Sequence, residues 1–207
     1  MRPLPRLHAV TDARVLAMPD LGIRAAAIAA AGSAVALHAR DRTAAAAALA
    51  RAALRLQALA RPPEAALFVS ARPDLAAAIG AHGVQLGGDD LAPADARRVL
   101  PRGWIGRSVH DAREAETALE EGADFLLVGA VYPTPSHPGR PAAGLGLVRA
   151  AAALGRPVIA IGGIDPARAV EAREAGAYGV AAIGALWDAA DPAAAALALL
   201  APWQEDA

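Results

Sequence analysis

The sequence of 207 residues contains no cysteine. This absence excludes a disulfide framework, a thiolate zinc site, an iron–sulfur cluster and a cysteine nucleophile. Lysine is absent as well, so all 20 basic side chains are arginine. A Schiff-base mechanism and a lysine general base are therefore excluded. Any phosphate must be held by arginine, by backbone N–H groups or by a metal ion.

The chain also has little net charge and no long hydrophobic run. Its 20 basic and 21 acidic side chains give a formal net charge of -1, which argues against a nucleic-acid or membrane-surface partner. Arginine, proline or glycine interrupts every alanine-rich stretch before it is long enough to span a membrane. The first residues lack the apolar core of a signal peptide. We therefore expect a cytoplasmic enzyme that forms one domain over residues 1–207.

Short apolar runs alternate with alanine-rich stretches of helical composition. The runs predict strands at Leu7–Thr11, Ala34–His38, Ala66–Val69, Gly83–Leu86, Trp104–Val109, Phe125–Val128, Pro157–Ile161 and Tyr178–Ile183. The stretches between them predict helices at Leu21–Ala31, Thr43–Ala60, Pro73–Gly80, Pro93–Leu100, Asp111–Glu121, Leu145–Leu154, Pro166–Ala175 and Pro192–Leu200. Continuous apolar strands are typical of a parallel sheet that is buried on both faces.

Eight strand–helix units predict an α/β fold of the (β/α)₈ TIM-barrel type. An open doubly wound sheet is the alternative, and it usually has a glycine-rich phosphate motif after its first strand. Here the first strand ends in Val10, Thr11 and Asp12, without glycine. The glycines gather instead after the seventh and eighth strands, where barrels commonly bind phosphate. The barrel is therefore the favoured fold.

The glycines after the last two strands predict a phosphate site. Consecutive glycines allow backbone N–H groups to approach an anion, and a helix that begins at Asp165-Pro166 would place its positive end nearby. The alternative is that these glycines only relieve crowding at the barrel rim. The predicted phosphate-binding residues are Gly144, Gly162, Gly163, Ile183 and Gly184.

The active site of a barrel forms at the carboxyl ends of its strands, so polar residues there are candidates for chemistry. Asp89 and Asp90 are candidate magnesium ligands, although one of them is alternatively a cap for the helix near Ala92. The proline-rich loop over residues 131–141 has the composition of a stiff lid. His8 and His82 are expected at strand starts, on the opposite face of the barrel, with structural roles. The other candidates are Thr11, Asp12, His38, Arg40, Ser70, Arg72, Gln85, Ser108, His110, Tyr132, Thr134, Ser136 and His137.

Five segments in order resemble the thiamine phosphate synthase/TenI family: Leu7–Asp12, Gly83–Gly87, Gly106–His110, Tyr132–Ser136 and Ala160–Ile164. The resemblance covers nearly the whole chain. It implies a TIM barrel whose ligands are a phosphorylated thiazole and thiamine phosphate. One branch joins a pyrimidine diphosphate to the thiazole phosphate with Mg²⁺ and releases pyrophosphate. The TenI branch isomerises a thiazole carboxylate phosphate and needs no cofactor.

The chain departs from the synthase pattern at several polar positions. Ala36 and His38 stand where the resemblance implies glutamine and arginine, and Arg40 replaces lysine. After the third strand, Ser70 and Ala71 replace an asparagine and a magnesium-binding aspartate, which leaves Asp90 as the implied metal ligand.

These losses favour the TenI-like tautomerase, although Ala130 replaces a histidine that some TenI proteins carry. His38 and His137 are therefore the candidate catalytic proton carriers. A divergent synthase is the main alternative, and a non-catalytic protein that binds thiazole or thiamine phosphate is another. The predicted substrate-binding residues are Arg40, Ser70, Gln85, Ser108, Thr134 and Ser136. The alanine-rich helical exterior is compatible with a homodimer.

Overall fold

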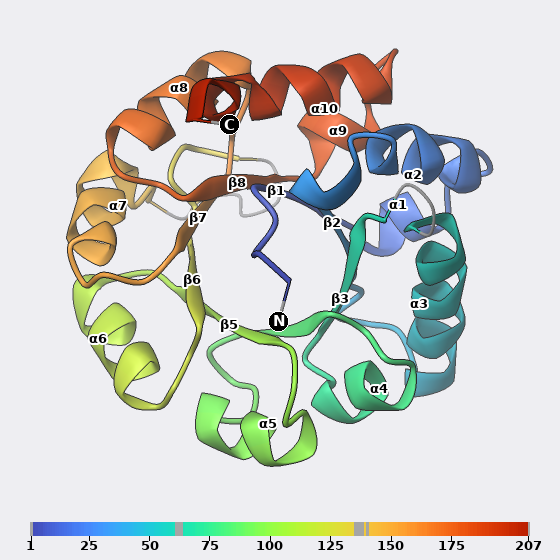
Figure 1. Cartoon of the computed structure of the whole chain (residues 1–207), viewed down its shortest axis with the longest axis horizontal. Helices are drawn as coiled ribbons and strands as arrows, with labels where there is room; N and C mark the ends of the chain where they lie inside the picture. The colour runs from blue at the N-terminus through green and yellow to red at the C-terminus, as the bar shows by residue number, and fades with distance from the viewer. Residues whose placement is uncertain (1, 61–63, 135–138, 140, 207) are drawn as a thin grey trace.

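The computed structural model describes residues 2–60, 64–134, 139 and 141–206. Its eight strands are β1 (Leu7–Val10), β2 (Val35–Ala39), β3 (Ala66–Ser70), β4 (Gly83–Leu86), β5 (Trp104–Val109), β6 (Phe125–Val128), β7 (Val158–Ile161) and β8 (Gly179–Ala182). They are parallel and pair in sequence order, and β1 closes the barrel against β8 (Figure 1). The predicted TIM barrel is confirmed.

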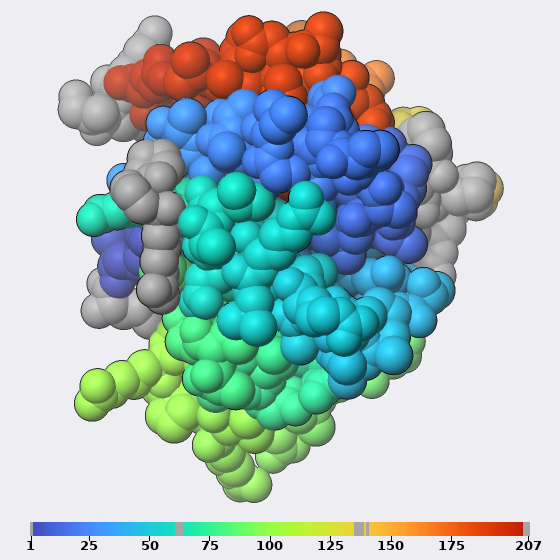
Figure 2. Space-filling view, turned by 90° about the vertical axis from the view of Figure 1, so that its right-hand side faces the viewer, coloured from blue at the N-terminus to red at the C-terminus, as the bar shows by residue number. Residues whose placement is uncertain are grey.

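Helices surround the barrel. They are α1 (Ala13–Leu16), α2 (Leu21–Ala29), α3 (Ala46–Ala60), α4 (Pro73–Ala78), α5 (Pro93–Val99), α6 (Ala112–Glu120), α7 (Gly144–Ala152), α8 (Pro166–Glu174), α9 (Gly184–Trp187) and α10 (Pro192–Leu200), with 3-10 turns at Gly32–Ala34 and Ala201–Asp206. Helices α10, α2 and α3 lie side by side on the face that Figure 2 shows. In the described residues no helix is long and apolar enough to cross a membrane.

Local chemistry explains where most of these helices begin. The Asp165 carboxylate accepts a hydrogen bond from the Arg168 backbone N–H at 2.9 Å, with proline at the first helical position. Asp191 caps α10 in the same way, and this combination of cap and proline is a common helix start. The two four-residue helices α1 and α9 were not predicted. They are too short to show a helical repeat of apolar residues.

The core has two parts because residues along each strand alternate between the two faces of the barrel wall. Val35, Leu37 and Ala39 of β2 belong to the larger cluster, which packs between the strands and the helices. Ala36 belongs to a smaller cluster in the interior of the barrel, which also contains Phe68 and Phe125. The same alternation places His38 in the interior.

The N-terminal segment closes the barrel at the end where the strands begin. Figure 1 shows this segment crossing the barrel opening. Leu4 is buried there, and its carbonyl accepts a hydrogen bond from the Tyr178 hydroxyl at 2.8 Å. The Trp104 indole donates to the Arg2 carbonyl at 3.1 Å. Contacts between residues far apart in sequence thus close this end of the barrel, which we call the floor. The opposite end, where the strands finish, is left for a site.

Candidate functional site

Three neighbouring strands end in polar side chains that face the barrel interior. They are His38 near the end of β2, Ser70 at the end of β3 and Gln85 in β4, where Ser70 and Gln85 are register partners. Each carries a buried atom without a hydrogen-bond partner in the described structure: His38 Nδ1, Ser70 Oγ and Gln85 Oε1. Unpaired buried polar atoms are costly, so this cluster is the strongest local sign of a ligand site.

Gln85 and Ser108 were predicted as substrate-binding residues, and the structure brings them together. The Gln85 amide Nε2 donates to Ser108 Oγ at 3.1 Å and to the Leu86 carbonyl at 3.2 Å. Because a carbonyl only accepts, the contact with Leu86 sets the orientation of the amide. The unpartnered Oε1 is therefore an acceptor in the interior of the barrel.

His38 does not lie at an open mouth of the barrel, and this corrects the expected placement. Its side chain is fully buried, it stacks on Phe68 with ring centroids 5.0 Å apart, and its Nε2 lies 2.7 Å from His8 Nδ1. Burial lowers the pKa of His38 well below its usual range, with positive charge on His8 and Arg40 acting in the same direction. His38 is therefore neutral at neutral pH and a weak proton acceptor.

The structure also revises the location of His8. It was expected on the opposite face of the barrel, but its ring packs in the interior between His38 and Phe125. Its Nε2 lies 3.1 Å from the Pro5 carbonyl, and burial lowers its pKa to about 4. The available signal was its spacing of two residues from the interior residue Val10, which places both on one face of β1.

Arg40 follows β2 at the edge of the site. The Thr11 hydroxyl accepts from the Arg40 backbone N–H at 2.9 Å and lies 3.0 Å from the Arg40 carbonyl, so the end of β1 holds this residue in place. The guanidinium is half-buried and forms no ion pair within the described part of the chain. An anionic ligand would supply the missing partner.

The glycines after β7 have a structural role that is visible in the backbone. Gly162 and Gly163 have φ values of 101° and 64°, in the left-handed region. A Cβ on Gly163 would lie 2.8 Å from the Pro133 carbonyl oxygen, so the loop after β6 packs directly against it. A side chain at Gly163 would disturb this packing as well as any bound anion.

The other predicted phosphate-binding residues are placed differently. Gly184 is exposed at the start of α9, directly after Ile183, whose carbonyl accepts from the Trp187 backbone N–H at 2.9 Å. Gly144 begins α7, but its N–H donates to the Val131 carbonyl at 3.1 Å. The Gly144 amide is thus already engaged, which leaves the loops at Gly162–Gly163 and Gly184 as the better candidates.

Asp90 is anchored in the loop after β4. Its Oδ2 accepts from the Gly87 backbone N–H at 2.6 Å, whereas the helix that follows has Ala92 at its N-cap position and no side-chain cap. The helix-capping alternative for Asp89 or Asp90 is therefore wrong. Arg107 braces the same loop by donating to the Gly88 and Leu91 carbonyls at 2.9 and 3.1 Å.

A magnesium ion would find few protein ligands here. In the described residues no group of three histidine or acidic side chains is placed to hold a metal ion, and Ala71 carries no carboxylate. Mg²⁺ usually keeps several waters and binds through one or two carboxylates plus substrate phosphate. Asp90, with one oxygen not used by Gly87, fits an ion that is held mainly by a diphosphate and water.

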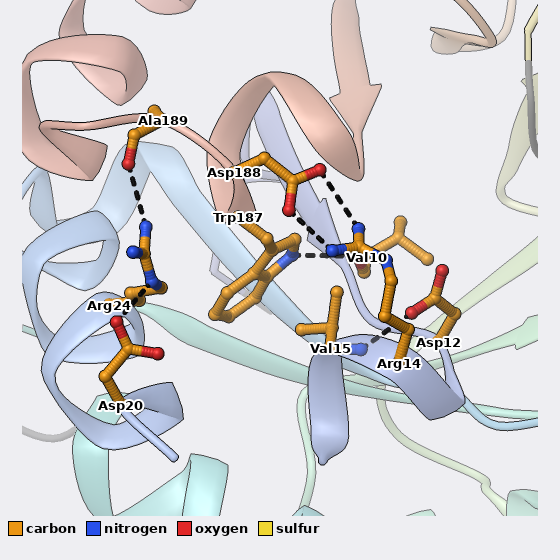
Figure 3. Close-up of polar contacts among 9 residues, drawn as sticks. All are labelled: Val10, Asp12, Arg14, Val15, Asp20, Arg24, Trp187, Asp188 and Ala189. Atoms are coloured by element: carbon orange, nitrogen blue, oxygen red, sulfur yellow. Dashed lines mark hydrogen bonds and ion pairs between the residues drawn. The ribbon is translucent and has the colours of Figure 1, made fainter. Parts of the chain in front are cut away.

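The segments that follow β1 and β8 are joined by the polar contacts that Figure 3 shows. Arg14 and Asp188 form a two-point ion pair, with N–O distances of 2.5 and 3.1 Å. The buried Trp187 indole donates to the Val10 carbonyl at 2.8 Å, and Asp12 caps α1 through the Val15 N–H. These contacts tie α9 to the first strand and hold the backbone at Gly184. Sequence reasoning missed Arg14 and Asp188, which are 174 positions apart.

The segment after β6 is only partly described. The Tyr132 hydroxyl donates to Glu171 of α8 at 2.6 Å, so it is directed at a helix rather than into the barrel. Thr134 is half-buried in the same segment. Ser136 and His137, predicted as a substrate-binding and a catalytic residue, lie outside the described residues, as do the other lid residues 135, 138 and 140.

Comparisons with known proteins agree with this architecture. Residues 7–186 match the family described as thiamine monophosphate synthase. A thiamine-phosphate synthase from Thermus thermophilus is 52% identical over 147 residues, which cover 70% of this chain and 71% of the relative. One from Mycobacterium sp. (strain JLS) is 47% identical over 163 residues, 77% of this chain and 69% of the relative.

A solved structure, the thiamine phosphate pyrophosphorylase from Pyrococcus furiosus, is 32% identical with a TM-score of 0.81 and covers 97% of this chain and 96% of its own. The synthase alternative fits these findings better than the tautomerase, for which they offer no support. The matched region contains all eight strands and the polar cluster at their carboxyl ends. The chain therefore belongs to the thiamine monophosphate synthase family, whose members act in thiamine biosynthesis.

Proposed function

We propose that this protein is a thiamine-phosphate synthase, which joins a pyrimidine diphosphate to a thiazole phosphate and releases pyrophosphate. The observation that carries the proposal is the match of residues 7–186 to the thiamine monophosphate synthase family, together with relatives of 52% and 47% identity that are named thiamine-phosphate synthase. A tautomerase needs a group that removes and returns a proton near neutral pH. His38 is fully buried and burial lowers its pKa, so it is poorly suited to carry a proton near neutral pH.

The residues of the site have distinct tasks in this reaction. Arg40 stabilises the charge that develops on the departing diphosphate, a role suited to a half-buried guanidinium without an ion pair in the described structure. The backbone at Gly163 and Gly184 binds the phosphate of the thiazole. His38, Ser70 and Gln85 hydrogen-bond the pyrimidine ring through their unpartnered atoms. The substrates are small phosphorylated molecules, and the enzyme acts in the cytoplasm without a nucleic-acid or membrane partner.

Magnesium is the cofactor that this reaction implies. When bound to the diphosphate, Mg²⁺ would neutralise charge on the leaving group. Asp90 is the residue that would hold it, and Arg107 would keep the Asp90 loop in place. The expected requirement for Mg²⁺ separates the synthase from the tautomerase, which needs no cofactor.

The tautomerase remains a second candidate because of one residue. Ala71 is exposed, with a φ of 63°, and supplies no carboxylate to share a metal ion with Asp90. The tautomerase reaction uses no metal ion, so it would tolerate the missing carboxylate at Ala71. In that reaction His137 would have to carry the proton.

A turnover assay with both substrate sets, with and without Mg²⁺, tests the proposal. We expect thiamine phosphate and pyrophosphate from the pyrimidine diphosphate and thiazole phosphate, and no product after excess EDTA. Isomerisation of thiazole carboxylate phosphate that persists in EDTA, without synthase turnover, would establish the tautomerase instead. Binding of thiazole phosphate without either reaction would indicate a non-catalytic binding protein.

A further inference from the structure

The two histidines in the barrel interior form a hydrogen-bonded chain that begins at the floor. The Pro5 carbonyl lies 3.1 Å from His8 Nε2, and His8 Nδ1 lies 2.7 Å from His38 Nε2. Both rings are fully buried. His38 Nδ1 has no partner in the described structure. The chain therefore runs from the backbone of the N-terminal segment to one unpaired atom.

The direction of this chain follows from the hydrogen-bonding capacity of each atom. A carbonyl oxygen only accepts, so His8 must donate to Pro5 from Nε2. A neutral imidazole carries one N–H, so His8 Nδ1 is an acceptor. His38 must then donate to it from Nε2, which leaves His38 Nδ1 without a proton. The opposite arrangement would bring the lone pair of His8 Nε2 against the Pro5 carbonyl oxygen.

The same logic applies to Gln85 on β4, the second strand along the barrel from β2. The Leu86 carbonyl accepts a hydrogen bond from the Gln85 amide Nε2. Gln85 Oε1 is therefore left as an unpaired acceptor. The Pro5 carbonyl, through His8, fixes the tautomer of His38, and the Leu86 carbonyl fixes the orientation of the Gln85 amide. Each of these two side chains therefore has an unpaired acceptor in the barrel interior. Acceptors of this kind match a ligand with N–H donors, such as an amino-substituted heteroaromatic ring.

We propose that His8 is a positioning residue that holds His38 in the tautomer protonated at Nε2, so that His38 Nδ1 accepts a hydrogen bond from an N–H group of the substrate. This inference rests on the proposed function only for the identity of that substrate, the pyrimidine diphosphate. His8 acts through His38 and does not contact the substrate. His38 acts as a hydrogen-bond acceptor and carries no proton in the reaction.

Nitrogen NMR of the histidine rings tests the tautomer without any ligand. We expect His38 to show a protonated Nε2 and an unprotonated Nδ1 in the wild-type protein at pH 7. In His8→Phe, which keeps an aromatic ring among Phe68 and Phe125 but removes the acceptor, His38 should lose this single tautomer. His8→Asn, whose side-chain oxygen substitutes for Nδ1, should restore part of it. A wild-type His38 protonated at Nδ1 would overturn the proposal.

A double-mutant cycle tests the link to substrate binding. We expect His8→Phe to raise the Kd of the pyrimidine diphosphate about tenfold, the effect of one hydrogen bond. In a His38→Asn background the same change should alter Kd less than about twofold, because the two residues act as a unit. If His8→Phe raised Kd by the same factor in the wild-type protein and in the His38→Asn protein, His8 would act independently of His38, and the proposal would be overturned.

The two proposals fail in different ways. If the wild-type protein does not bind the pyrimidine diphosphate, the proposed function fails, and the role assigned to His38 Nδ1 in substrate binding is overturned with it. If the protein makes thiamine phosphate but His8→Phe changes neither the His38 tautomer nor Kd, the role of His8 is overturned and the proposed function stands.

Discussion

His8 Nδ1 and His38 Nε2 lie 2.7 Å apart inside the barrel, and neither side chain is exposed to solvent. Two neighbouring imidazoles in this setting are stable only when both are neutral, because burial penalises the charged form of each. Their relationship therefore links the stability of the fold to pH.

We expect the protein to lose stability as pH falls from about 6.5 towards 4. The pKa of His8 is lowered to about 4 in the folded state from its ordinary 6.5, so the unfolded state binds the proton first. The loss from His8 alone is about 3 kcal/mol of unfolding free energy across this window, and His38 shifts in the same direction. Urea unfolding at pH 7 and pH 4.5 measures it. A His8→Phe/His38→Leu variant should show a flatter dependence, and an equal slope would contradict the assignment.

Arg40→Gln should weaken binding of the pyrimidine diphosphate. The guanidinium is half-buried and lacks an ion pair within the described residues, so its natural partner is an anion. Loss of a charged hydrogen bond of about 1.5–3 kcal/mol corresponds to a Kd increase of roughly tenfold to a hundredfold. Arg42→Gln, at an exposed position two residues away, is the matched control. Isothermal titration calorimetry with both variants checks the result, and similar affinities would argue against the role of Arg40.

Gly184→Asp should weaken binding of thiazole phosphate about tenfold or more, because it places a negative charge beside the bound anion. Gly184 suits this test better than Gly163, since among the described residues a new Cβ there meets only the Asp188 carboxylate, at 3.1 Å. Gly184→Ser adds a side chain without charge and should change the affinity far less. Equal losses in the two variants would attribute the effect to bulk, and unchanged binding in both would place the phosphate elsewhere.

Asp90→Asn should raise the Mg²⁺ concentration needed for half-maximal turnover about tenfold, because an amide is a poorer ligand for a hard cation. The asparagine oxygen can still accept from the Gly87 N–H, so the loop should keep its shape. Asp89→Asn, at the exposed neighbouring position, is the control. Magnesium titrations of the initial rate distinguish the two, and identical curves would remove Asp90 from the metal site.

Much of the site was predictable because a barrel orders its residues by strand. The carboxyl ends of β2 to β5 gather His38, Ser70, Gln85 and Ser108 at one end of the molecule, whatever the details of packing. The pair Gln85 and Ser108 was predicted as part of one site and is found in contact. The preference for the tautomerase finds no support among the relatives, and the synthase alternative fits them better. That preference treated His38 as an exposed histidine, whereas the structure buries it.

The amino-acid sequence by itself determined the order of strands and helices, since apolar runs, capping aspartates, prolines and glycines act over a few neighbouring residues. Closure of the barrel decided the rest. Pairing of β1 with β2 brought His8 to His38, and closure of β1 against β8 carried Arg14 to Asp188 over 174 positions. The pKa values of the two interior histidines depend on burial, and burial is a property of the assembled barrel rather than of any local segment.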